Sequence, residues 1–228
     1  MSFCCCCCPC RPLDPDSEGE REPLRGPQSA RQLRRPTEFM AMKDGRITAK
    51  LVNVADLDQC FADIVHTFNH QQKNHITLLE STRLLKECCQ CNTLIDCFQR
   101  LQHENSHFEI KLDVQGYNFS LSVQPQQSIP NQLQLAQQYT KQLCASTISI
   151  IAADPKLQEM INSMVQAEDE HLEKVKLVND SYQEQSRRLS NVKDNFMEVK
   201  RAKQLSNVYR EEAHRILKDI AKLADIKV

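Results

Sequence analysis

The 228-residue chain has no tryptophan, only four glycines and an aromatic content of 5%. Glycine supplies the positive φ angles that tight turns and phosphate-binding loops need, so four glycines leave little scope for a many-stranded β fold or a nucleotide-binding loop. The motifs G-x-G-x-x-G, G-x-x-x-x-G-K-[ST], G-x-S-x-G and H-E-x-x-H do not occur. The composition therefore favours a mainly helical chain, and we predict no catalytic residue and no cofactor.

The sequence also lacks an excess of either charge. Twenty-nine Lys and Arg stand against thirty Asp and Glu, which gives a formal charge of −1. Basic residues between Arg187 and Arg210 form the nearest approach to a cationic patch, but glutamates dilute it and few aromatic side chains accompany it. No run approaches the length of about 18 apolar residues that a membrane span requires. We therefore expect neither a nucleic-acid partner nor a transmembrane helix.

Cysteine is abundant, with twelve in the chain, and six of them crowd at the N-terminus. They are Cys4, Cys5, Cys6, Cys7, Cys8 and Cys10. Adjacent cysteines cannot all form useful disulfides, and no signal-peptide pattern precedes them, so we expect a reducing, cytoplasmic location. S-acylation of this block would anchor the protein peripherally to a membrane. The alternatives are an unconstrained low-complexity leader and a soft-metal site, the latter disfavoured because C-x₂-C pairs are missing.

The order of segments predicts a leader followed by a head. Residues 1–38 are rich in Cys, Pro and Arg and are expected to be disordered, with a short extended lead-in at 39–55. The head, 56–153, is predicted as helix, β-hairpin and helix. Its first part, 56–105, reads as a long helix or helical pair capped by Asp56 and loosened near 69–74, where polar residues run together. Alternating apolar residues at 108–123 around Gly116 indicate the hairpin, and 131–153 indicates the next helix.

A heptad pattern follows Asp154-Pro155, which we interpret as the N-cap and first residue of a new helix. Residues 154–228 contain no further proline and no glycine, and apolar residues recur every three or four positions. This pattern predicts a coiled-coil rod whose seam needs partner helices, either from a second copy or from another chain, because helix 131–153 could cover only part of it. The predicted interaction seam comprises Leu157, Ile161, Met164, Val175, Val178, Tyr182, Leu189, Val192, Phe196, Val199, Tyr209, Ile216, Ile220 and Leu223. Polar seam residues at Glu168, His171 and Gln185 would set register or partner.

Two groups of residues have metal-binding types, yet we predict no metal. Cys88, Cys91 and Cys97 precede His103 and His107, but the thiols share a stripe with leucines and phenylalanine and are better explained as core residues. His66 and His70 are one helical turn apart without a third ligand at suitable spacing.

The fold prediction is mostly α, with a long C-terminal coiled-coil helix, upstream helices, one small β-hairpin and a disordered N-terminus. The functional hypothesis is a non-catalytic coiled-coil subunit or adaptor of a larger intracellular complex, in a cytoskeletal, ciliary, centrosomal or vesicle-tethering setting. Its partners would be protein helices, as a homo- or hetero-oligomer. The alternative is a peripheral membrane protein held by acylated N-terminal cysteines, the one case in which a membrane is a partner.

Overall fold

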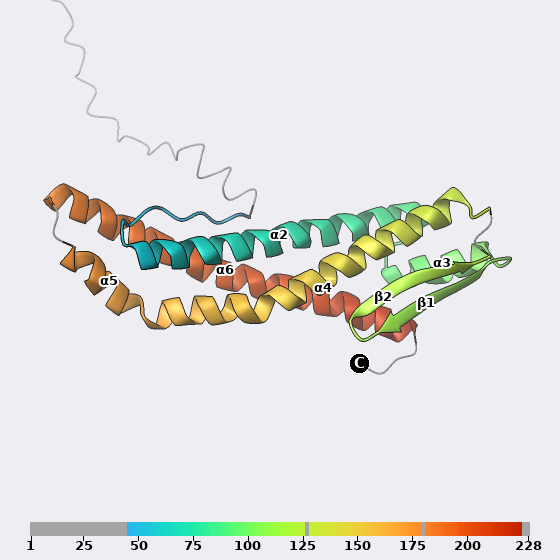
Figure 1. The fold of residues 1–228 in the computed structure, drawn as a ribbon. Coiled ribbons are helices and arrows are strands. Elements are labelled where there is room, and N and C mark those ends of the chain that lie inside the picture. The colour runs from blue at the N-terminus through green and yellow to red at the C-terminus, as the bar shows by residue number, and fades with distance from the viewer. Residues whose placement is uncertain (1–44, 126–127, 179–180, 225–228) are drawn as a thin grey trace, which may run out of the picture.

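A computed structural model describes residues 45–125, 128–178 and 181–224, so the N-terminal cysteines and the expected disordered leader lie outside the described residues. The elements are α2 (Ala55–Cys89), α3 (Leu94–Glu104), β1 (Glu109–Gln115), β2 (Asn118–Gln124), α4 (Asn131–Gln166), α5 (Glu168–Leu177) and α6 (Tyr182–Leu223). Figure 1 shows an elongated helical bundle with a small hairpin near one end. The predicted class, mostly α with one hairpin, is confirmed.

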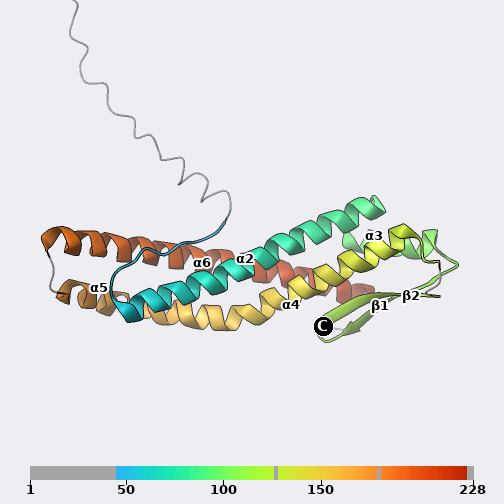
Figure 2. The same ribbon diagram turned by 45° about the horizontal axis from the view of Figure 1, so that its top comes forward.

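Helices α2, α4 and α6 run along the length of the bundle (Figures 1 and 2). Phe61 packs edge-on against Phe196, and further along both helices His75 contacts Glu212, so α2 and α6 are parallel. Helix α4 runs antiparallel to α2, because Gln71 bonds to Ile150 whereas the later Cys88 bonds to Gln132. The three helices enclose a single apolar core.

Of the two alternatives expected at 56–105, one long helix or a helical pair, the structure has the pair, α2 and α3, with two differences in detail. Helix α2 is continuous where we expected loosening at 69–74, because its polar side chains have partners across the bundle: Gln71 donates to the Ile150 carbonyl and Asn74 to Ser149 Oγ. The N-cap is Val54 rather than Asp56. Asp58 instead accepts the backbone N–H of Val52, at 2.8 Å.

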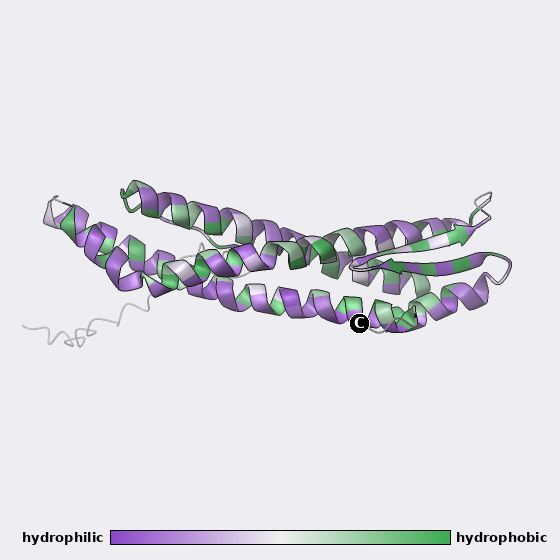
Figure 3. Cartoon of the chain, turned by 60° about the horizontal axis from the view of Figure 1, so that its bottom comes forward, coloured by the Kyte–Doolittle hydropathy of each residue, from purple (hydrophilic) through white to green (hydrophobic). Residues whose placement is uncertain are grey.

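The predicted hairpin is also confirmed. β1 and β2 pair in antiparallel register from Glu109 opposite Gln124 to Gln115 opposite Asn118, and Gly116 turns the chain with φ 61°. Hydrophobic and hydrophilic residues alternate along both strands (Figure 3). An isolated hairpin is marginal in water, so it needs cover for its apolar face. Helix α4 supplies it: Phe119 is buried and its N–H contacts Cys144 Sγ, while Gln137 donates to the Leu121 carbonyl.

The prediction that a new helix begins at Asp154-Pro155 is wrong. Helix α4 continues through Pro155 to Gln166 and crosses the predicted boundary between head and rod. A proline within a helix removes one backbone hydrogen bond. Packing against α6 compensates here: the buried Asp154 carboxylate accepts from Ser206 Oγ at 3.2 Å and from Arg210 at 3.1 Å, and Ile150 and Leu157 are fully buried on either side.

The continuous rod expected over 154–228 is likewise wrong. The chain leaves helical geometry at Ala167, and Val178 at the end of α5 and Ser181 at the start of α6 are both extended. Helices α5 and α6 therefore pack against each other as separate helices rather than forming one rod. Ser181 caps α6 by accepting the Glu184 N–H, and Gln185 donates to the Lys176 carbonyl at 3.0 Å across the corner. The two halves of the heptad pattern therefore face each other within one chain.

Candidate protein-interaction surface

The predicted seam is largely covered inside the bundle. Ten of its fourteen residues are buried: Leu157, Ile161, Met164, Val175, Val192, Phe196, Val199, Tyr209, Ile216 and Ile220. Asn162 bonds to Lys203 and Gln158 to Asn207, which shows that the first third of the heptad pattern packs antiparallel on the last third. The expectation that the upstream helix covers only part of this seam and that partner helices must cover the rest is corrected: most of the seam residues are core residues of the chain itself.

The polar seam residues have partners inside the chain. Glu168 forms an ion pair with Lys200, at 2.6 Å, and Gln185 holds the α5–α6 corner. His171 stacks near Phe196, with ring centroids 6.3 Å apart, and burial and then the nearby Lys174 lower the pKa of its imidazole. These residues therefore fix the register of α5 on α6.

Three of the remaining four seam residues come from the C-terminal end of α5 and the first turns of α6. The end of α5 and the start of α6 extend beyond the N-terminal end of α2 (Figures 1 and 2). We call residues 168–178 and 181–189 the α5–α6 arm. Val178 and Leu189 are half-buried there and Tyr182 is exposed, while the fourth residue, Leu223, is half-buried at the far end of α6. A two-helix arm can cover only one side of its apolar seam, because it lacks the third helix that closes the core elsewhere.

The tip of the arm carries the two most exposed large hydrophobic side chains of the described residues. Leu177 is 82% and Tyr182 85% exposed, on either side of the turn between the helices. Single exposed apolar residues are common, but two highly exposed ones at the end of a projecting element are a feature of binding surfaces, where tyrosine is enriched. Leu177 was absent from the predicted seam because it falls outside the heptad spacing.

The cysteines of the head lie at the corner between α2 and α3. Cys89 and Cys97 are buried, Cys88 and Cys91 are half-buried, and the thiol hydrogen bond between Cys89 and Cys97 raises the pKa of Cys89 and lowers that of Cys97. Cys91 Sγ donates to the Cys89 carbonyl, at 3.2 Å. Within the described ranges, no three His, Cys, Asp or Glu side chains come together in a way that could hold a metal ion.

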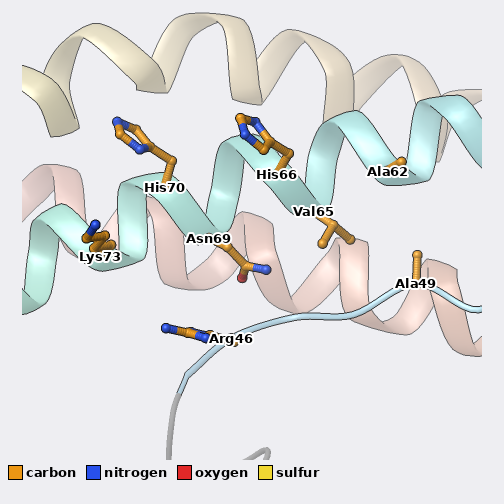
Figure 4. A pocket seen from close by; sticks show the side chains of 8 residues that line it. All are labelled: Arg46, Ala49, Ala62, Val65, His66, Asn69, His70 and Lys73. Atoms are coloured by element: carbon orange, nitrogen blue, oxygen red, sulfur yellow. The ribbon is translucent and has the colours of Figure 1, made fainter.

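A surface cavity of about 570 Å³ lies along α2 and is bordered by Arg46 and Ala49. Figure 4 shows the side chains that line it. Arg46, Lys73, His66 and His70 line it together with small and apolar residues, and no acidic side chain is among the lining. His66 and His70 lie on one side of α2, and Arg46, which belongs to the lead-in, lies on the other side (Figure 4).

Residues 45–54, which belong to the lead-in expected at 39–55, form a strap between α2 and α6. No contact of this segment was predicted from the sequence. Asn69 of α2 accepts the Ile47 N–H and donates to the Ile47 carbonyl, both at 3.0 Å. Asn195 of α6 does the same for Lys50, at 2.7 and 2.8 Å. Two features of the sequence are consistent with this docking: Ile47 is a large apolar residue in a polar segment, and asparagines interrupt the apolar pattern of the helices.

None of the helices in the described part of the chain is long and apolar enough to cross a membrane. The sequence matches no protein-family model, and neither a curated protein nor a solved structure shows significant similarity to it.

Proposed function

We propose that this protein is a non-catalytic intracellular adaptor or complex subunit that binds other proteins through its α5–α6 arm. The observation that carries the proposal is the exposure of Leu177 and Tyr182 at the tip of an element that projects from the bundle. Burial of both side chains in a partner would remove apolar surface from water, which is the main source of affinity in protein association.

The half-buried apolar residues of the arm favour partners that are themselves helical. Val178 and Leu189 continue the apolar stripe next to the exposed tip, and Lys176 and Arg187 pair with Glu173 and Glu184 on its flanks. One or two helices laid along this stripe would complete a three- or four-helix bundle. The partner helices come from a second copy or from another protein, and a cytoskeletal, ciliary, centrosomal or vesicle-tethering complex is the proposed setting.

The test compares complexes captured with the intact protein and with a double variant, Leu177→Asp and Tyr182→Asp. Both side chains are exposed, so the variant should keep its helicity, measured by circular dichroism. We expect the bound proteins identified by mass spectrometry, or self-association measured by light scattering, to be lost. The matched control is Met197→Asp with Tyr117→Asp, an aliphatic and an aromatic residue that are 62% and 57% exposed elsewhere. An arm variant that keeps every interaction would contradict the proposal.

A second function is membrane anchoring through thioesters on the N-terminal cysteines, and the clustering of six cysteines within seven residues favours it. Lipid labelling that hydroxylamine removes, present in the intact chain and absent from a chain beginning at Met40, would support it. Unlabelled wild-type protein in cells would exclude it.

A further inference from the structure

The strap is held like a bound peptide rather than like a strand or helix of the fold. Within the described part of the chain, the backbone of residues 47–52 forms no ladder with a strand, and its hydrogen bonds go to side chains of α2 and α6. Asn69 and Asn195 each grip one residue by both N–H and carbonyl, Asn191 donates to the Leu51 carbonyl, and Asp58 accepts the Val52 N–H. Amide side chains that bond to the main chain recognise any extended peptide, whatever its side chains.

Side-chain recognition in this groove is limited to three positions. Ile47 and Val52 are fully buried, and Lys50 Nζ forms a 2.7 Å ion pair with Asp194. Thr48, Ala49 and Leu51 are exposed. The groove therefore selects an apolar residue, then a cation three positions later, then an apolar residue two positions after that.

One position of the strap is mismatched in charge. Arg46 and Lys73 line the same cavity from the strap and from α2 (Figure 4), and neither forms an ion pair with any residue that the structure describes. Two unpaired cations beside one cavity repel each other weakly. An acidic residue at the position of Arg46 would instead bring the charge opposite to that of Lys73 to this cavity.

We propose that the groove between α2 and α6 is a binding site for an extended peptide of a partner protein, and that residues 45–54 occupy it when the partner is absent. The preferred ligand has an acidic residue, an apolar residue, any two residues, a cation, any residue and an apolar residue in that order. It differs from the strap in the first of these positions, where charge complementarity with Lys73 favours it. The site is separate from the α5–α6 arm, so it stands or falls independently of the function proposed above.

The test uses the full chain and a fluorescent peptide with the sequence of residues 45–54. Ile47→Asp with Val52→Asp places carboxylates where the groove is apolar and releases the strap. Peptide affinity, measured by anisotropy, should rise about tenfold or more over that of the wild-type chain, because the strap no longer competes. Thr48→Asp, an exposed strap position, is the matched control and should leave the affinity unchanged. A released groove, folded by circular dichroism, that binds no peptide would overturn the proposal.

Two further variants test the contacts themselves in the released background. Asn195→Leu should weaken peptide binding about tenfold or more, because two backbone hydrogen bonds are lost. A peptide with Arg46→Glu should bind about two- to fivefold more tightly than the native sequence, and Lys73→Glu should reverse that preference. Equal affinity of both peptides for both chains would overturn the ligand assignment. A wild-type chain that dimerises with rising concentration, as shown by light scattering, would assign the groove to a second copy instead of a partner protein.

If the released variant does not fold, hydrogen exchange of the wild-type chain tests whether the strap opens separately from the bundle. The amides of Ile47, Lys50 and Val52 should exchange about tenfold or more faster than that of Phe68 within α2, because the strap opens without unfolding the bundle. Exchange of all four amides at one common rate would mean that the strap is an inseparable part of the core and would overturn the proposal.

Discussion

His75 of α2 and Tyr209 of α6 lie face to face, with ring centroids 4.0 Å apart and an interplanar angle of 19°. His75 Nε2 is also 2.7 Å from Glu212 Oε2, and the phenol ring of Tyr209 stacks on Phe68 at 6.0 Å. Tyr209 of α6 thus contacts two turns of α2, through Phe68 and His75. Burial raises the pKa of Tyr209, which keeps the phenol neutral in the folded protein.

Replacement of this aromatic contact should weaken the bundle. Tyr209→Ala is expected to lower the free energy of unfolding by about 3 to 5 kcal/mol, the range for a large buried aromatic residue replaced by alanine. Urea unfolding followed by circular dichroism measures the change. Tyr209→Phe keeps the ring contacts and should cost less than about 1 kcal/mol. Equal losses in the two variants would show that the hydroxyl, not the ring, holds the helices together.

Asp154, the residue before Pro155 in α4, is nearly fully buried and accepts hydrogen bonds from α6. Asp154→Ala would leave Ser206 and Arg210 of α6 without this acceptor at a buried contact. We expect a loss of about 2 to 4 kcal/mol in the free energy of unfolding, because removal of one partner leaves polar groups unpaired in the interface. The comparison is Glu184→Ala, which breaks an ion pair with Arg187 on the exposed arm and should cost less than about 1 kcal/mol. Similar losses at both sites would contradict the assigned role.

The helices, the hairpin and the apolar positions could be predicted because each depends on local periodicity. Gly116 and the alternation around it specified the turn, and ten seam residues chosen by heptad spacing are core residues. Helix ends were predicted less well. The proline rule placed a boundary at residue 154, but partners 52 and 56 residues away on α6 override it.

The sequence could not predict what the heptad seam packs against, again because the answer depends on contacts between distant residues. A seam that faces another chain and one that folds back on itself have the same spacing. The difference lies at the facing ends of α5 and α6, where Val178 is extended, Ser181 caps α6 and Gln185 donates to the carbonyl of Lys176. The docking of the strap could not be predicted either, because it depends on asparagines that are 22 and 145 residues away from their partners in the strap.

His171 should make stability depend on pH. Its folded-state pKa is lowered by burial and by Lys174, so the unfolded chain binds more protons once the pH falls below the ordinary value of about 6.5. Stability is therefore complete above that pH and declines as the pH falls through it. His171→Phe keeps an aromatic ring against Phe196 and should reduce the loss of stability between about pH 7.5 and about pH 5. His66→Phe, on the exposed face of α2, is the control, and an equal reduction there would contradict the role of His171.

Gly45 holds the start of the strap with a φ of +67°, a conformation that residues with a Cβ adopt at a cost of about 1–2 kcal/mol. A Cβ at this position would lie 3.3 Å from Gln72 Nε2 and 3.6 Å from the Tyr209 hydroxyl. Gly45→Ala should therefore speed hydrogen exchange of the Ile47 amide by about 5- to 30-fold. Gly116→Ala, which has a φ of +61° and no atom within 4 Å of the added Cβ, should strain the hairpin without changing exchange at Ile47. An Ile47 amide that exchanges at the wild-type rate in Gly45→Ala would mean that the strap is held from Ile47 onward and that Gly45 contributes nothing to its seat.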